Sequence, residues 1–277
     1  MDRIIIPPLG LGTWRMGESS ARHGGELGAL RTALELGYRL FDTAEMYAEG
    51  GAESLLGEAL VQAQRGGLAR EALCIVSKVY PHHASRSGLL AACERSLKRL
   101  RLDRIDLYLL HWRGTVPLAE TVAGFEELQR RGWIGRWGVS NFDTEDMAEL
   151  FALPGGEGCS ANQVWYSLSR RGVEFDLLPW QRQRGLPLMA YSPIDQGALA
   201  GHAGLQRLAA GRSATPAQLA LARLLAEPGV VVIPKSCEPL RLRQNLEAAA
   251  LTLSAQDRAA LDRLFPPPRR RQPLAVG

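Results

Sequence analysis

Residues 74–111 read CIVSKVYPHHASRSGLLAACERSLKRLRLDRIDLYLLH and contain a strand, a helix and a second strand in that order. The first candidate strand is Cys74–Val79. The second, Ile105–His111, is almost entirely apolar, which is typical of a parallel strand covered on both faces. Between them, Ser87–Arg101 places most leucines on one face and most basic side chains on the other, which predicts an amphipathic helix.

The same alternation continues along the whole chain. The candidate strands are Leu9–Thr13, Arg39–Thr43, Cys74–Val79, Ile105–His111, Arg136–Asn141, Ala161–Tyr166, Leu186–Ser192 and Val230–Pro234. Eight strand–helix repeats are compatible with a doubly wound open sheet or a closed barrel. The first junction, Gly10–Arg15, lacks the full glycine fingerprint of a dinucleotide-binding open sheet, and no linker divides the chain. We therefore expect a single-domain (β/α)8 TIM barrel spanning residues 1–277.

Helix ends can also be predicted. Thr215, Pro216 and Gln218 have the spacing of a capping box with proline at the first helical position. Asp143 is placed to cap a helix that runs through Phe151, and Gly132 to end the helix that begins near Leu118.

Composition limits the possible partners. The 277 residues have a net charge of +4, and 46% of them are hydrophobic. The densest basic run, Arg269–Arg271, follows three prolines, so we interpret residues 266–277 as a short solvated tail rather than a nucleic-acid-binding arm. The chain has no signal-peptide pattern and no membrane-spanning apolar run. Cys74, Cys93, Cys159 and Cys237 are widely spaced, as in reduced cytoplasmic proteins. We expect a cytoplasmic monomer without a nucleic-acid or membrane partner and without a metal site.

Polar residues follow the apolar strands. Asp42, Lys78 and His111 end the second, third and fourth strands, and the later strands end at Ser140 and Asn141, Gln163, Tyr191 and Lys235. In a barrel all these ends meet at one mouth, where active sites of this fold lie. Asp42 and Lys78 would lie on neighbouring strands and can pair, which offsets the cost of burying either charge alone.

Tyr47 lies five residues after Asp42, in the loop above the second strand. A nearby lysine ammonium favours the phenolate, so we expect the pKa of Tyr47 to fall below its usual value near 10. Such a phenol can donate and accept a proton near neutral pH.

The sequence resembles the aldo-keto reductase superfamily, most closely its compact bacterial members that reduce methylglyoxal and related small carbonyls. Six segments stand in the family's order: Phe41–Tyr47, Val76–Val79, Leu109–Trp112, Trp137–Asn141, Ala190–Pro193 and Ile233–Ser236. The resemblance implies a catalytic tetrad of Asp42, Tyr47, Lys78 and His111. It implies that Tyr47 donates the proton, that Lys78, held by Asp42, assists it, and that His111 orients the substrate oxygen.

The resemblance also implies NADPH as cofactor. The implied cofactor-binding residues are Gly12, Thr13, Trp14, Asp42, Ser140, Asn141, Gln163, Tyr191, Ser192, Pro193, Lys235, Ser236, Arg241, Gln244 and Asn245. Lys235, Ser236 and Arg241 match the site of the 2′-phosphate. Two positions depart from the family pattern: Gln244 replaces the usual glutamate at the adenine end, and Ile194–Gly197 differs from the usual Leu-Gly continuation.

The implied substrate pocket consists of Trp14, Tyr47, Tyr80, His111 and Trp112. The loop after Trp112 and the segment after residue 265 are short, so we expect a permissive pocket for small aldehydes and ketones. Two other functions are compatible with the residues. One is an NADPH-binding regulatory barrel with little turnover; the other is a Schiff-base lyase built on Lys78, which the nearby Asp42 disfavours by keeping the lysine protonated.

Overall fold

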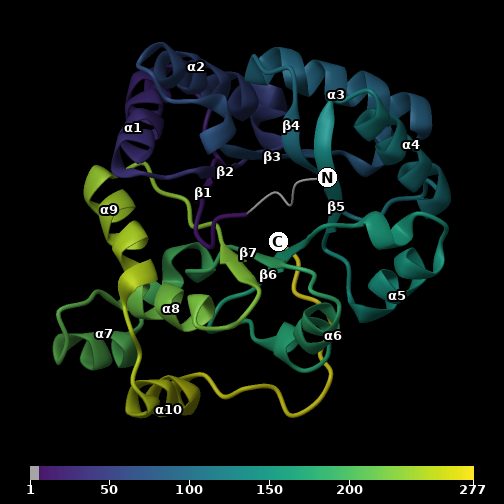
Figure 1. Cartoon of the computed structure of the whole chain (residues 1–277). Coiled ribbons are helices and arrows are strands. Elements are labelled where there is room, and N and C mark those ends of the chain that lie inside the picture. Colours follow the sequence, from purple (N-terminus) through teal and green to yellow (C-terminus); the bar gives the residue numbers. More distant parts are fainter. Residues whose placement is uncertain (1–5) are drawn as a thin grey trace.

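Eight parallel strands pair in chain order in the computed structural model, which describes residues 6–277 (Figure 1). The strands are β1 (Leu11–Gly12), β2 (Leu40–Asp42), β3 (Cys74–Val79), β4 (Ile105–Leu110), β5 (Ile134–Ser140), β6 (Asn162–Trp165), β7 (Leu188–Tyr191) and β8 (Val230–Val232). All eight predicted strands are present. Most are shorter than expected, whereas β5 begins two residues earlier, at Ile134.

Hydrogen bonds between the first and last strands close the sheet. Leu9 forms a parallel bridge with Val232, Gly10 N–H donates to the Val232 carbonyl at 2.9 Å, and Val232 N–H donates to the Pro8 carbonyl at 2.8 Å. The closed barrel predicted from strand–helix alternation is therefore confirmed.

Helices surround the barrel on all sides (Figure 1). They are α1 (His23–Leu36), α2 (Gly51–Arg65), α3 (Arg86–Leu100), α4 (Leu118–Arg130), α5 (Thr144–Ala152), α6 (Leu177–Gln183), α7 (Ala203–Ala210), α8 (Pro216–Leu225), α9 (Pro239–Glu247) and α10 (Ala255–Leu264). The predicted caps are confirmed: Asp143 begins α5, and Thr215 with Gln218 forms a capping box on α8.

The hydrophobic core has two main layers. Inside the barrel, side chains such as Val76, Leu107 and Leu109 pack against one another. A larger layer fills the space between the strands and the surrounding helices and includes the stacked rings of Phe125 and Trp137. A filled barrel leaves its carboxyl end as the place for a site. None of the helices in residues 6–277 has the length and hydrophobicity that crossing a bilayer requires.

The segment 266–277 lies along the surface of the molecule instead of projecting away from it. After α10 it runs back along the molecule, and its end lies near the barrel axis (Figure 1). Arg269 and Arg270 are exposed, as a charged run usually is, but Arg271 forms ion pairs with Asp143, Glu145 and Asp176. Most residues of this segment are exposed, as the interpretation as a solvated tail expects, but carboxylates at the starts of α5 and α6 hold it along the molecule, and sequence spacing does not reveal these partners.

Candidate active site

A cavity of about 870 Å³ lies at the carboxyl ends of the strands, where the predicted polar residues meet. Most of the predicted site residues line it: Gly12, Trp14, Asp42, Tyr47, His111, Trp112, Ser140, Asn141, Gln163, Tyr191, Ser192, Pro193, Lys235, Ser236, Arg241, Gln244 and Asn245. This is the position that the barrel fold assigns to an active site.

A buried ammonium holds the catalytic end of the cavity together. Lys78 Nζ donates to Asp42 Oδ2 at 2.7 Å, to the Thr43 carbonyl oxygen at 2.8 Å and to the Tyr47 hydroxyl at 3.3 Å. Asp42 Oδ1 accepts a further hydrogen bond from Gln163 Nε2 at 2.7 Å. The Lys78 side chain is fully buried, and all three of its donors have partners. The predicted pairing of Asp42 with Lys78 is present.

Burial changes the pKa values of Tyr47 and Lys78 from those expected. Burial raises the pKa of Tyr47 above 10.0 and outweighs the opposing effect of the Lys78 ammonium, so the predicted lowering is wrong. Burial alone would lower the pKa of Lys78, but Asp42 and Tyr47 raise it above 10.5. At neutral pH the pair is therefore a phenol beside an ammonium. A lysine charged and enclosed in this way is a poor nucleophile, which argues against a Schiff-base lyase.

His111 completes the group as a neutral imidazole. Burial, with a smaller contribution from the Lys78 ammonium, lowers the pKa of His111 well below 6.5. Its ring stands edge-on to the ring of Tyr47, with centroids 5.8 Å apart. His111 Nδ1 is buried and has no hydrogen-bond partner among residues 6–277. The imidazole and the Tyr47 phenol therefore face the same end of the cavity without a charge on either.

Amide and hydroxyl groups line the adjacent wall. Tyr191 donates its phenolic hydrogen to Asn141 Oδ1 at 2.9 Å, and Asn141 Nδ2 donates to the His111 carbonyl oxygen at 3.0 Å. Ser140 Oγ donates to the Gln163 carbonyl oxygen at 2.8 Å. These bonds fix the side chains relative to the tetrad, and the unpaired capacity of the amides can recognise a carboxamide.

Cations gather at the far end of the same cavity. Lys235 and Arg241 are exposed there, and neither forms an ion pair with a carboxylate of residues 6–277. Ser236 lies between them in sequence, and its Oγ accepts a hydrogen bond from the Glu238 N–H at 3.1 Å. Two unpaired cations and a hydroxyl suit a dianionic phosphate.

Comparison with known proteins agrees with this geometry. Residues 8–265 match the Aldo/keto reductase family. The chain belongs to this family. It is 46% identical over 271 residues to methylglyoxal reductase YeaE of Escherichia coli K12, covering 96% of this chain and 93% of that protein. It is 33% identical over 275 residues to methylglyoxal reductase DkgB of E. coli O157:H7, covering 95% and 97%.

A solved aldo/keto reductase from Klebsiella pneumoniae, in complex with NADP and acetate, has 47% sequence identity and a TM-score of 0.94 to this chain. The match covers 98% of this chain and 96% of that structure. The resemblance inferred from six short segments is therefore confirmed over the whole fold.

Three predicted residues of this aldo/keto reductase lie behind the cavity wall. Lys78 is covered by its partners, and Thr13 is buried with its hydroxyl donating to the Asp42 carbonyl oxygen at 3.1 Å. Tyr80 packs edge-on against Trp112, with ring centroids 5.9 Å apart, instead of lining the cavity. Thr13 therefore positions Asp42, and Tyr80 supports Trp112 from outside.

Sequence reasoning missed several residues of the wall: Arg15, Met46, Ala200, Thr215, Pro216, Ala217, Ile233, Pro234 and Gly277. Arg15 follows Trp14 in the loop after β1, so its place at a strand end was a usable signal. Thr215 was predicted as a helix cap, but the sequence did not show that this helix starts beside the cavity. Nothing in the sequence points to Gly277.

The loops around the mouth carry most of the unusual backbone. Among residues 6–277, eight non-glycine residues have positive φ, and all except Arg101 lie in loops that follow strands. Asn141 is one of them, at φ 61°, and Asp195 and Gln196 are two others. In the unusual segment Ile194–Gly197, the side chain of Asp195 accepts a hydrogen bond from Ser169 at 2.7 Å, and the other three residues line the cavity. Conformations of this kind gather at functional sites.

Proposed function

We propose that this aldo/keto reductase reduces small aldehydes and ketones, such as methylglyoxal, to alcohols with NADPH as reductant. The main observation behind this proposal is that a phenol (Tyr47), an ammonium (Lys78) and an imidazole (His111) lie at one end of a cavity whose other end is cationic. The names of two relatives, both methylglyoxal reductases, support the substrate class. The NADP in the Klebsiella structure supports the cofactor.

The residues present fit this cofactor. Lys235, Ser236 and Arg241 would hold the 2′-phosphate, because two unpaired cations and a hydroxyl face one region. Gln244 and Asn245 on α9 would contact the adenine end; Gln244 keeps hydrogen-bonding capacity without the usual charge. At the opposite end, Ser140, Asn141 and Gln163 would hold the nicotinamide carboxamide, beside the ring of Tyr191. Gly12, Trp14, Ser192 and Pro193 would complete the cofactor wall, with Thr13 behind it.

Bound NADPH would supply the hydride for the carbonyl carbon. Tyr47 would donate its phenolic proton to the carbonyl oxygen as negative charge develops there. The Lys78 ammonium, 3.3 Å from the phenol oxygen, would stabilise the resulting phenolate, and Asp42 keeps that ammonium charged. His111 would hydrogen-bond the same oxygen. Donors fixed before the reaction stabilise the transition state more than the ground state.

The substrate pocket would be formed by Tyr47, His111, Trp14 and Trp112. Trp14 and Trp112 are each 36% exposed at the mouth, so the pocket is shallow and open. Tyr80 would act through Trp112. We also propose that the protein is a monomer and that it is cytoplasmic. The four free cysteines support the proposed location. Carbonyl reduction is favoured over the alternative of a regulatory barrel with little turnover, because both relatives named above are methylglyoxal reductases.

A substrate panel measured with NADPH and NADH in parallel tests the proposal. We expect the purified protein to oxidise NADPH when given methylglyoxal or 4-nitrobenzaldehyde, and to use NADH more slowly. Tight NADPH binding without turnover on any carbonyl would favour the regulatory alternative and contradict the proposed activity.

A further inference from the structure

The segment 266–277 ends against the catalytic part of the cavity. Gly277 lines the cavity together with Tyr47 and Tyr191. It also touches the indole of Trp165, since a Cβ added to Gly277 would lie 2.4 Å from that ring. The segment therefore contributes Gly277 to the wall of the cavity that contains Tyr47 and His111.

One arginine provides the polar anchor of this segment. Arg271 pairs with Asp143 at 3.2 Å, with Asp176 at 3.3 Å and with Glu145. Asp143 and Asp176 are the N-caps of α5 and α6, so the guanidinium joins the segment to the starts of two barrel helices. The neighbouring Arg270 is exposed and has no ion pair with residues 6–277.

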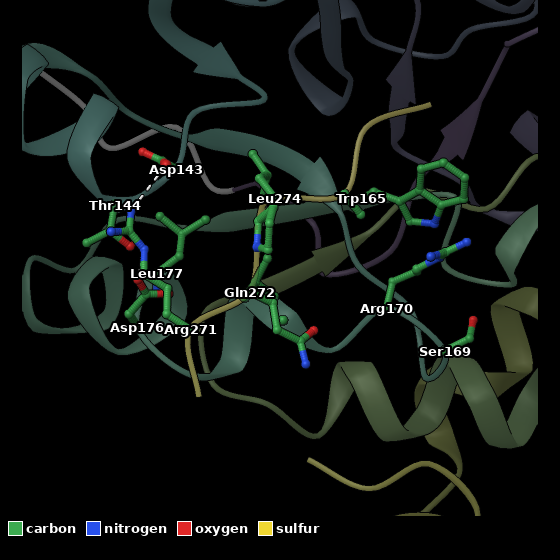
Figure 2. A pocket seen from close by; sticks show the side chains of 14 residues that line it. Asp143, Thr144, Trp165, Ser169, Arg170, Asp176, Leu177, Arg271, Gln272 and Leu274 are labelled. Carbon is green, nitrogen blue, oxygen red and sulfur yellow. Dashed lines mark hydrogen bonds and ion pairs between the residues drawn. The ribbon is translucent and has the colours of Figure 1, made fainter. Parts of the chain in front are cut away.

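Packing beneath the segment is incomplete. Figure 2 shows Gln272 and Leu274 between Thr144 and Leu177 on one side and Trp165 on the other, around a second cavity of about 200 Å³. Two buried polar atoms at this cavity, Thr144 Oγ1 and Trp165 Nε1, have no hydrogen-bond partner in the described part of the chain. Leu274 packs against the core, whereas Val276 is 67% exposed. A contact surface with a void and unpaired donors holds a segment weakly.

We infer that Arg271 is a positioning residue for catalysis: its ion pairs hold residues 272–277 in place, so that Gly277 forms part of the wall of the carbonyl pocket. This inference rests on the proposed carbonyl reduction. Because Arg271 and its partners are partly exposed, their attraction is screened by salt. The affinity for the carbonyl substrate should therefore depend on Arg271 and on ionic strength, whereas proton donation by Tyr47 should not.

The test compares Arg271→Ala, Arg271→Lys and the matched control Arg270→Ala, with NADPH saturating and neutral carbonyl substrates of two sizes. Exposed ion pairs are individually weak, but three carboxylates pair with the Arg271 guanidinium. The KM for the carbonyl substrate in Arg271→Ala should therefore rise roughly three- to tenfold, and kcat should change less than about twofold. Arg271→Lys should restore part of the loss. Added salt should raise the wild-type KM toward that of Arg271→Ala and should leave the KM of that variant nearly unchanged.

Amide hydrogen exchange over residues 266–277 provides a second readout that needs no turnover. Faster exchange in Arg271→Ala than in Arg270→Ala, together with the KM change, would support the inference. Equal exchange in the two variants, or a KM in Arg271→Ala equal to that of the control, would overturn it. A wild-type protein that reduces no carbonyl would instead overturn the proposed function, and the exchange measurement would still decide whether Arg271 holds the segment.

Discussion

At the residue scale, burial and a neighbouring ammonium act on the Tyr47 phenol in opposite directions. Burial has the larger effect and raises the pKa of Tyr47, while the pKa of Lys78 also lies above its usual value. The proton to be donated is therefore present on the phenol at neutral pH, and the charge that stabilises its loss is already in place. This arrangement favours reduction, in which Tyr47 would act as an acid.

The direction of these shifts predicts the pH profile of reduction. Tyr47 stays protonated up to its pKa, above 10.0, Lys78 stays charged up to its pKa, above 10.5, and His111 stays neutral down to its pKa, well below 6.5. None of these three groups changes protonation between about pH 6.5 and about pH 10. We expect kcat for carbonyl reduction at saturating NADPH to be flat over this range. A decline centred near about pH 8 would indicate a lowered Tyr47 pKa and would contradict this account.

The sequence predicted the tetrad from two sources. Asp42, Lys78 and His111 could be read from polar residues at the ends of apolar strands, because a barrel brings those ends together. Tyr47 depended more on the family resemblance, since a loop tyrosine has no periodic signal. The sign of its pKa shift was wrong because the depth at which a loop side chain is buried depends on tertiary packing.

At the scale of elements, close contact between α2 and α3 depends on a glycine. A Cβ on Gly57 would lie 2.4 Å from the Arg99 carbonyl oxygen and 2.8 Å from the Leu100 carbonyl carbon. Backbone atoms cannot move aside as a flexible side chain can, so only glycine allows the two helices to approach this closely.

Gly57→Ala should therefore destabilise the fold by about 1–3 kcal/mol, because the two helices must separate. The matched control is Gly28→Ala in α1, where no atom of residues 6–277 outside the helix backbone lies within 4 Å of the added methyl group. That change should stabilise the protein by about 0.5–1 kcal/mol, since alanine is the better helix former. Urea unfolding of both variants measures the difference. Equal effects in the two variants would show that α2 and α3 do not limit each other's position.

At this scale the sequence predicted where two helices start but not the path of the segment 266–277. The caps at Asp143 and Thr215 were predicted because capping is a local interaction over three residues. The path of residues 266–277 was not, because Arg271 finds its partners more than ninety positions earlier in the chain. Long-range ion pairs of this kind leave no local pattern.

At the scale of the whole molecule, barrel closure brings distant parts of the chain together, and these parts form the two ends of one cavity. The catalytic end is built from residues in β2 and β3 and in the loops after β2 and β4, and the cationic end from residues after β8 and on α9. A cofactor long enough to contact both ends would form contacts with the first half and with the second half of the chain. Its binding should therefore stabilise the fold as a whole.

Thermal unfolding measured with NADPH and with NADH tests this arrangement. NADPH should raise the unfolding temperature more than NADH does, because Lys235 and Arg241 have no carboxylate partners within residues 6–277 and can bind the extra phosphate. Arg241→Ala should weaken NADPH binding by roughly 10- to 100-fold, the value of a hydrogen bond to a charged group, and should reduce the difference between the cofactors. Arg243→Ala, on the same helix but away from the cavity wall, is the control. Equal behaviour of both variants would place the phosphate elsewhere.

The most direct test of the central claim is the turnover of Tyr47→Phe, measured beside its affinity for NADPH. This change removes one hydroxyl and keeps the ring against His111. Loss of a positioned proton donor should lower kcat by roughly 10²- to 10⁴-fold, while the Kd for NADPH stays within about twofold of wild type. A Tyr47→Phe variant that reduces carbonyls at the wild-type rate would contradict the assignment of Tyr47 as the proton donor.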